Sequence, residues 1–394
     1  MAVRKLKDGI YSVGAIDWDR RLFDELIPLP DGTTYNAYII KGEEKTALLD
    51  TVDPAKKDEL IGNLKNLKVE KIDYIIAHHA EQDHSGTIPD ILSLYPEAKV
   101  VTNSKCKGFL MDLLHIPEDK FIVVNDGDTL SLGGRTLKFI FTPWVHWPET
   151  MVTYLTPDNI LFTCDFFGSH YASSDLFVKD KEKVLEDAKR YYAEIMMPFR
   201  FQIRKNLEKI KDLKIEVIAP SHGLVYDEPE LIINAYREWI SDGVKNMVLI
   251  PYVSMHGSTF RMVNYLIDAL IKRGIGVKPF NLIKTDIGEL AMALVDAATI
   301  VIGTPTVLAG PHPYVVYATY LVGALRPKTK FISIIGSYGW GGKTVDTLKS
   351  LIPTLKAEII EPLLIKGDPD EEDFNLIDEF ADKILLAHKN IGLL

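Results

Sequence analysis

The sequence predicts an α/β protein with two domains, an αββα sandwich followed by a doubly wound parallel sheet of five strands. Its 394 residues exceed what one hydrophobic core usually supports. The first part of the chain reads as hairpins interleaved with helices, whereas the last third alternates apolar strands with helices. The polar stretch 241–246 separates these two patterns. We therefore expect one domain at residues 1–245 and a second at residues 246–394.

The first domain is expected to hold two stacked sheets with helices outside them. Residues 35–40 and 45–52 alternate on either side of a turn, and residues 121–143 contain glycine breaks, so both stretches predict hairpins. Asp53-Pro54 supplies a helix cap and a proline at the first helical position. The apolar side chains that follow fall on one helical face: Leu60, Ile61, Leu64 and Leu67. A helix of this kind covers a sheet, which favours the sandwich.

The second domain is predicted from a regular succession of strands and helices. Apolar strands are expected at 248–253, 277–282, 299–303, 330–335 and 357–364. Helices are expected from 258 to a closing Gly274, at 289–295, 314–325 and 344–351, and from about 371 onward. Five apolar strands separated by helices are typical of a doubly wound parallel sheet.

Composition narrows the function classes. Apolar residues make up 47% and charged residues 25% of the chain, as in ordinary globular proteins. The formal net charge of −10 opposes binding to nucleic acid, and no apolar stretch approaches membrane-spanning length. The N-terminus lacks the apolar core of a secretory signal, so we expect a cytoplasmic protein that binds neither nucleic acid nor membrane. Cys106 and Cys164 are the only cysteines, which excludes a disulfide framework and a cysteine-ligated iron–sulfur cluster.

A cluster of potential metal ligands is the sharpest signal in the first domain. His79, Glu81, Asp83 and His84 lie in one loop directly after the apolar strand 74–77. Three more candidates also follow predicted strands: His146, Asp165 and His222. Ligand sites collect at the carboxyl ends of strands in α/β sheets. Imidazole and carboxylate donors without thiolate suit iron, manganese or zinc.

Aromatic and imidazole side chains near the candidate ligands serve either to support the ligands or only to pack in the core. His170 lies five positions after Asp165 and is a candidate for the layer of residues around the ligands. Trp147 adjoins His146, where an indole either packs or limits access to the pocket. His78 directly precedes the ligand loop, and strand alternation should point it away from the metals.

Three loops of the second domain predict a site for a phosphate-bearing cofactor. The first lies between a strand and a helix, where small residues, hydroxyls and a helix N-terminus suit a phosphate. The other two follow the next strands in the series, and Tyr338 and Trp340 offer aromatic contacts. The candidate residues are Ser254, Met255, His256, Gly257, Ser258, Thr259, Pro305, Thr306, Val307, Leu308, Ala309, Gly310, Ser337, Tyr338, Gly339, Trp340, Gly341 and Gly342. Neither a Walker A loop nor a G-x-G-x-x-G pattern is present, because positions 337 and 344 are Ser and Thr.

The ligand loop resembles the H-x-H-x-D-H signature of the metallo-β-lactamase superfamily, with Glu81 at the middle histidine. The extra carboxylate favours iron over zinc, because ferric iron gains most from oxygen ligands. With the later His146, Asp165 and His222 and a flavodoxin-like remainder, the chain resembles the flavodiiron proteins, also called A-type flavoproteins, over essentially its whole length. The resemblance implies a metallo-β-lactamase-like diiron domain followed by a flavodoxin-like FMN domain.

The resemblance also implies roles for the candidate residues. One iron would be held by His79, Glu81 and His146, the other by Asp83, His84 and His222, with Asp165 bridging both. FMN would occupy the three loops of the second domain. Electrons from an external donor, either rubredoxin or reduced coenzyme F420, would pass through FMN to the diiron centre and reduce dioxygen to water, nitric oxide to nitrous oxide, or both. A head-to-tail homodimer, or a dimer of such dimers, would bring flavin and iron together.

Two other functions stay open at this point. A zinc-dependent hydrolase of the metallo-β-lactamase type with an accessory flavodoxin-like domain would use the same ligand positions, although Glu81 argues against it. A flavodoxin-like electron carrier with an inactive metal domain would not need the intact set of ligands. Metal content and colour of the purified protein distinguish these cases.

Overall fold

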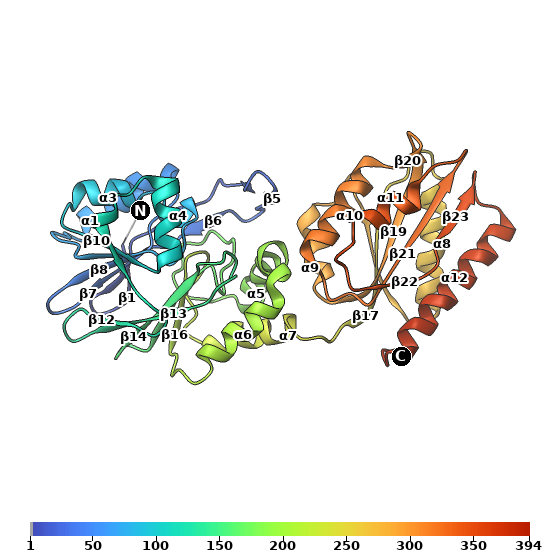
Figure 1. Ribbon diagram of the computed structural model, residues 1–394. Coiled ribbons are helices and arrows are strands. Elements are labelled where there is room, and N and C mark those ends of the chain that lie inside the picture. The colour runs from blue at the N-terminus through green and yellow to red at the C-terminus, as the bar shows by residue number, and fades with distance from the viewer. Residues whose placement is uncertain (1–2) are drawn as a thin grey trace. The chain divides into compact units, whose positions relative to one another are not determined.

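The computed structural model describes residues 3–394, which divide into two compact units (Figure 1). Unit 1 extends to Tyr192 and continues from Phe199 to Ile240. Unit 2 comprises Ser241–Leu394 together with the short segment Ala193–Pro198. No helix within residues 3–394 combines the length and the apolar character that a bilayer crossing demands.

Unit 1 contains two large sheets. The first has the order β1 (Arg4–Lys7), β2 (Ile10–Ser12), β7 (Tyr38–Lys41), β8 (Thr46–Leu49), β9 (Tyr74–Ile76), β10 (Lys99–Thr102) and β11 (Phe121–Val123). The second has the order β12 (Thr129–Ser131), β13 (Thr136–Phe141), β14 (Met151–Thr156), β15 (Ile160–Cys164) and β16 (Val217–Pro220). Two small pairs, β3 (Ala15–Asp17) with β6 (Thr33–Tyr35) and β4 (Leu22–Phe23) with β5 (Ile27–Pro28), complete it.

The layers of unit 1 follow from the alternation of side chains along the first sheet. Ile39 and Ile75 belong to a core that also includes Leu60, Leu64 and Leu110 of the covering helices. The next residue along each strand points the other way, into a core shared with the second sheet: Ile40 and Ile76 pack with Leu137, Phe139 and Phe162. The helices on the first sheet are α1 (Lys57–Asn66), α3 (Ile88–Leu94) and α4 (Ser104–Leu114) (Figure 1). Along the chain, α5 (Lys181–Tyr191) and α6 (Arg200–Ile210) lie between β15 and β16 of the second sheet, and α7 (Pro229–Trp239) follows β16.

The predicted hairpins are only partly confirmed. β7 and β8 form the expected antiparallel pair, as do β12 and β13. The prediction was wrong for β11, which pairs in parallel with β10 in the first sheet. After β11, the backbone turns at Gly127, whose N–H donates to the carbonyl of Phe139 in the second sheet at 2.8 Å. Residue alternation identifies a strand but not its partner, so the change of sheet could not be seen in the pattern.

The helix predicted after Asp53 is confirmed. The Asp53 carboxylate accepts from the N–H of Ala55, and Pro54 opens a short 3₁₀ turn, Pro54–Lys56, that leads into α1. Leu60 and Leu64 are buried in the core under this helix.

Unit 2 contains the predicted doubly wound sheet. Its strands run in parallel in the order β18 (Gly276–Asn281), β17 (Lys245–Tyr252), β19 (Ala297–Val307), β21 (Phe331–Tyr338) and then β22 (Glu358–Ile359) and β23 (Leu363–Lys366). The helices are α8 (Ser258–Lys272), α9 (Ile287–Leu294), α10 (Pro313–Leu325), α11 (Thr344–Ser350) and α12 (Glu371–Asn390). The α8 and α12 side chains share a core with β17 and β21 on one face of the sheet. A two-residue strand, β20 (Gly310–Pro311), folds back on the end of β19.

The fifth position of this sheet differs from the single strand predicted at 357–364. β22 pairs with the start of β21 and β23 with its end, and Pro362 lies between them. Proline has no N–H to donate to a ladder, which accounts for the interruption.

Candidate metal centre and cofactor cleft

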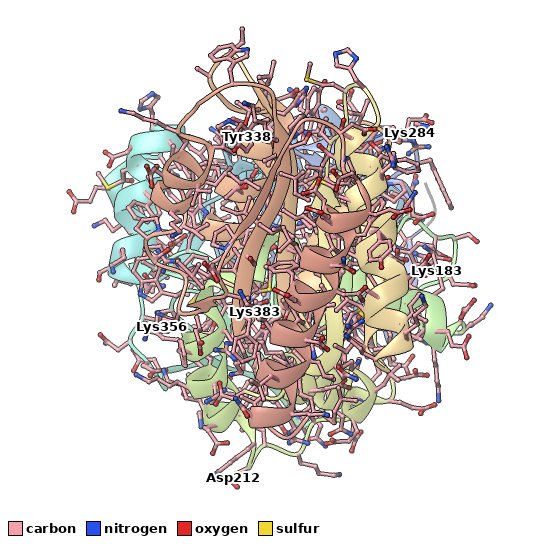
Figure 2. All side chains as sticks on the ribbon, turned by 90° about the vertical axis from the view of Figure 1, so that its right-hand side faces the viewer. Lys183, Asp212, Lys284, Tyr338, Lys356 and Lys383 are labelled. Carbon is pink, nitrogen blue, oxygen red and sulfur yellow. The ribbon has the colours of Figure 1, made fainter. Side chains whose placement is uncertain are left out.

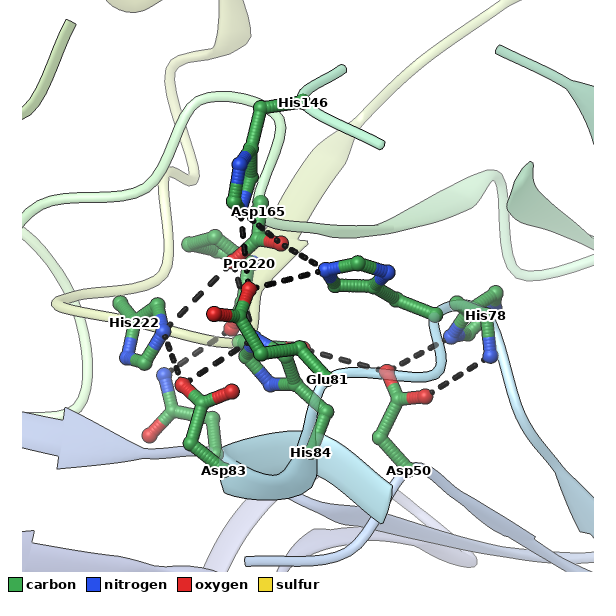
Figure 3. A network of polar contacts seen from close by, with 12 residues as sticks. Asp50, His78, Glu81, Asp83, His84, His146, Asp165, Pro220 and His222 are labelled. Atoms are coloured by element: carbon green, nitrogen blue, oxygen red, sulfur yellow. Dashed lines mark hydrogen bonds and ion pairs between the residues drawn. The ribbon is translucent and has the colours of Figure 1, made fainter. Parts of the chain in front are cut away.

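The seven predicted ligand side chains come together in unit 1 (Figure 3). His79 and Glu81 lie in the loop after β9, and Asp83 and His84 lie in the short helix α2 (Gln82–Ser85). The remaining three come from different segments: His146 follows β13, Asp165 follows β15, and His222 follows β16. The side chains therefore converge from segments that follow strands of both large sheets of unit 1.

The first group of donors consists of His79, Glu81, His146 and Asp165, with ligand atoms within 4.8 Å of one another. Oε2 of Glu81 lies 3.1 Å from Nε2 of His79 and 3.0 Å from Nε2 of His146. Two donors that are each about 2.1 Å from one ion, at right angles, lie about 3 Å apart. The group therefore has the spacing of a coordination shell.

The second group consists of Asp83, His84 and His222. Oδ2 of Asp83 lies 3.0 Å from Nε2 of His222 and 3.3 Å from Nε2 of His84. All three side chains are buried.

Asp165 lies between the two donor groups, and one of its carboxylate oxygens points toward each group. Its Oδ2 is 3.5 Å from Nε2 of His79 and 3.7 Å from Nε2 of His146. Its Oδ1 is 2.9 Å from Nε2 of His84 and 3.5 Å from Nε2 of His222. This is the arrangement that a carboxylate needs in order to bridge two ions.

Several buried atoms of the cluster have no hydrogen-bond partner among the residues described. These are Oδ1 and Oδ2 of Asp83, Oδ2 of Asp165 and Nδ1 of His84. Leaving a buried carboxylate oxygen unpaired is costly, so such atoms point to a missing partner. A pair of cations satisfies the oxygens of both carboxylates, and the donor set fits that occupant.

The electrostatics of the cluster are those of closely packed opposite charges. Burial alone would lower the pKa of His84, but the charges of Asp165 and Asp83 raise it to about 10. Burial would raise the pKa of Glu81, yet His146 and His79 hold it well below its ordinary value. The thiol of Cys164 is also close to His84 and Asp165, but burial raises its pKa well above the ordinary value. A neutral thiol is a poor ligand, which favours the nitrogen and oxygen donors.

The histidines are oriented by residues that the sequence did not single out. Nδ1 of His79 lies 2.7 Å from Oε1 of Glu149, and Nδ1 of His222 lies 2.6 Å from the carbonyl oxygen of Thr34. Tyr191 on α5 donates its hydroxyl to Oδ1 of Asp165 at 2.8 Å. These partners come from distant parts of the chain and carry no spacing signal. Glu149, three positions after His146, could have been found only as a carboxylate close to a candidate ligand.

His170 and Trp147 both lie against the ligands. The buried His170 ring has its centroid 5.0 Å from that of His222, and its Nδ1 lies 2.9 Å from Oγ1 of Thr33. The Trp147 ring meets His79 edge-on at 4.8 Å. His78 binds elsewhere: its Nδ1 lies 2.7 Å from the Asp50 carboxylate (Figure 3). Its Nε2 lies 2.7 Å from the Thr153 hydroxyl.

Unit 2 has a cleft of about 280 Å³ at the carboxyl ends of its parallel strands. Three predicted loops contribute to its lining with ten of the candidate residues: Ser254, Met255, His256, Ser258, Thr259, Pro305, Thr306, Ser337, Tyr338 and Gly339. Tyr338, which ends β21, lies at the same end of unit 2 as Lys284, which follows β18 (Figure 2). The N-terminus of α8 begins at Ser258, and Gly257 before it has a φ of +103°, a conformation that favours glycine.

The other eight candidates do not line the cleft: Gly257, Val307, Leu308, Ala309, Gly310, Trp340, Gly341 and Gly342. They lie in the same loops, where Leu308 is 89% and Trp340 69% exposed. A Cβ at Gly342 would meet the carbonyl oxygen of Ala309 at 2.8 Å, so the second and third loops touch there. The lining also includes Gly367 and Asp368, which were not among the predicted residues. Their signal was available, because they follow β23, the last strand of the same sheet.

The fold and these two sites define a metallo-β-lactamase-like metal-binding unit joined to a flavodoxin-like unit with a cofactor cleft. The family described as ODP family beta lactamase matches residues 33–223. The nitric oxide reductase of Moorella thermoacetica is 37% identical over 388 residues, which cover 96% of this chain and 97% of the relative.

Two solved structures match this chain over nearly its whole length. Rubredoxin oxygen:oxidoreductase from Desulfovibrio gigas matches with a TM-score of 0.95 and 31% identity, over 98% of this chain and 99% of that one. The flavodiiron protein from Giardia intestinalis matches with a TM-score of 0.92 and 28% identity, over 98% of each chain. The chain belongs to the flavodiiron protein family and is an oxidoreductase, which confirms the resemblance, the fold class and the enzyme class predicted from the sequence.

Proposed function

We propose that this chain passes electrons from an external donor through FMN to a diiron centre, where it reduces dioxygen to water, nitric oxide to nitrous oxide, or both. The proposal rests on the position of Asp165, whose two carboxylate oxygens each point toward a different donor group. One iron would be held by His79, Glu81 and His146, the other by Asp83, His84 and His222, and Asp165 would bridge them.

The donor set supports iron as the metal. It combines four imidazoles with three carboxylates, and the nearby thiol of Cys164 is held neutral by burial. Two bound ferrous ions and a reduced flavin supply the four electrons needed to convert dioxygen to two water molecules, and two of these suffice for two nitric oxide molecules.

The residues of the chain have separate tasks in this scheme. Tyr191 holds the bridging carboxylate through its hydroxyl, which leaves Oδ2 of Asp165 free for the first iron. Glu81 and His146 are the least buried donors, with side chains 16% and 14% exposed, so a small substrate would approach over them. The other donors exclude water by their burial.

The cleft of unit 2 is proposed to bind FMN. The hydroxyls of Ser258 and Thr259 at the start of α8 suit the phosphate, and Tyr338 offers an aromatic face to the flavin ring. In keeping with this division of labour, we propose that residues 1–245 form the diiron domain and residues 246–394 the FMN domain.

Flavin and iron must lie close together for electron transfer. We propose a head-to-tail homodimer, or a pair of such dimers, in which the FMN of one subunit lies beside the irons of the other. Rubredoxin or reduced coenzyme F420 would supply the electrons. Sedimentation of the active protein tests this assembly, and a monomer that turns over at full rate would contradict it.

The decisive experiment combines metal analysis, absorption spectroscopy and anaerobic turnover of the purified, reduced protein with each gas. Two irons and one FMN per chain with consumption of dioxygen or nitric oxide is the expected result. Colourless protein with two zinc ions and no gas consumption would instead support a hydrolase of the metallo-β-lactamase type.

A further inference from the structure

The imidazoles of the consecutive residues His78 and His79 each bind a buried carboxylate, and the two distances are equal. Oε1 of Glu149 lies 2.7 Å from Nδ1 of His79, and Oδ2 of Asp50 lies 2.7 Å from Nδ1 of His78. The pairs differ in what the second ring nitrogen meets. Nε2 of His78 lies 2.7 Å from the Thr153 hydroxyl, so both nitrogens of that ring are occupied.

His79 has its second nitrogen directed at the metal donors. Its Nε2 lies 3.1 Å from Oε2 of Glu81 and 3.5 Å from Oδ2 of Asp165. With Nδ1–H donated to Glu149, the lone pair of Nε2 faces the first donor group. A carboxylate behind a ligating imidazole fixes its tautomer and raises its basicity as a ligand.

Glu149 is built into this position. Its side chain is fully shielded from solvent, and Oε1 also accepts from the N–H of Ala80 at 3.1 Å. Its backbone carbonyl accepts from the Asn103 amide at 2.6 Å, and Asn103 in turn caps the start of α4. The carboxylate is therefore held in place from both its side chain and its backbone.

The second donor group has no such carboxylate behind its imidazoles. Nδ1 of His222 meets a neutral carbonyl, that of Thr34, and Nδ1 of His84 has no hydrogen-bond partner among the described residues. Each group has one carboxylate of its own and shares Asp165. The buried carboxylate of Asp50 acts on His84 electrostatically but is hydrogen-bonded to His78, whereas Glu149 is hydrogen-bonded directly to an imidazole of the first donor group.

We propose that Glu149 is a positioning residue which, through His79, makes the two iron sites unequal and stabilises the oxidised state of the first. This inference rests on the proposed diiron function. Removing its charge should favour the ferrous form, because a negative charge close to a metal stabilises the higher oxidation state.

The test is a redox titration of the iron-loaded protein in three variants. Glu149→Gln keeps the shape and the hydrogen-bond acceptor but removes the charge. We expect a shift of at least tenfold in the ferric–ferrous equilibrium of one iron toward ferrous, which is about 59 mV for one electron. Glu149→Asp keeps the charge and should retain most of the original potential. Asp50→Asn is the comparison, because Asp50 binds the imidazole of His78 rather than a proposed ligand and acts on His84 of the second group only through space. It should leave the potential of the first iron unchanged.

The outcomes separate the proposals. If the unaltered protein binds no iron, the proposed function fails. If it binds two irons but Glu149→Gln leaves both potentials unchanged, or Asp50→Asn shifts the potential of the first iron equally, only the role of Glu149 is refuted. A shift of equal size in Glu149→Asp would also refute it, since packing rather than charge would be responsible.

A measurement on the unaltered protein needs no variant. In the iron-loaded form, the Nδ1 proton of His79 should give an exchange-protected, paramagnetically shifted NMR signal. The absence of that signal would contradict the hydrogen bond on which the proposal depends.

Discussion

Replacing Asp165 by alanine tests the bridging arrangement directly. The substitution removes the one carboxylate that lies within 3.7 Å of imidazole nitrogens from both donor groups. Each proposed iron loses a ligand, and the charge that offsets the repulsion between the two ions disappears. A unit charge about 4 Å from another, at an effective dielectric constant of about 20, contributes about 4 kcal/mol. We therefore expect the affinity for the second iron to fall roughly a thousandfold.

The assay is anaerobic iron titration of the metal-free protein, followed by gas consumption with each substrate. The variant should hold at most one iron and lose most of its activity with both gases, while FMN content stays unchanged because the cleft residues belong to unit 2. Asp83→Ala is the matched comparison, since its carboxylate contacts only His84 and His222 in the second group. Two tightly bound irons and full gas consumption in Asp165→Ala would refute the bridging role.

Three further predictions concern the cofactors and the sheet of unit 2. Gly257→Val should lower the free energy of unfolding by about 1–2 kcal/mol, because a β-branched residue at a φ of +103° is strained, and an unchanged stability in urea unfolding would show this to be wrong. Gly336→Ala should lower the free energy of unfolding in urea by about 1–3 kcal/mol, because the added Cβ would clash with the carbonyl oxygen of Thr304. Gly341→Ala is the control: its Cβ would have nothing within 4 Å, so stability should change by less than about 0.5 kcal/mol. Iron removal should lower the thermal unfolding temperature, since it leaves both oxygens of Asp83 and Oδ2 of Asp165 buried without a hydrogen bond. An identical temperature with and without iron would argue against a metal there.

The candidate ligands, which the structure brings together, could be selected from the sequence because they come after strands. A buried strand fixes where its last residue lies, and polar side chains immediately beyond it converge at the sheet edge. His79 and His222 lie three and two residues past the ends of β9 and β16, whereas His146 lies five residues past the end of β13. The central strands β17, β19 and β21 of unit 2 were recognisable for a related reason, because strands buried on both faces are apolar throughout.

Residues that orient the candidate ligands through tertiary contacts were not predicted. Glu149 meets His79 across 70 positions of sequence, and Tyr191 reaches Asp165 from a helix whose pattern shows only amphipathic packing. Thr34 contributes a backbone carbonyl, which has no residue signature at all. The partner of β11 was missed because pairing across sheets depends on the path of a turn rather than on alternation.

The uneven burial of the donors sets an order in which the metals can be lost. The side chains of Glu81 and His146 are partly exposed to solvent, whereas those of Asp83, His84 and His222 are buried. A bulky chelator can engage an ion only where water already reaches it. Extraction should therefore proceed in two phases, with the ion beside Glu81 leaving first and the inner ion following only when the surrounding loops open.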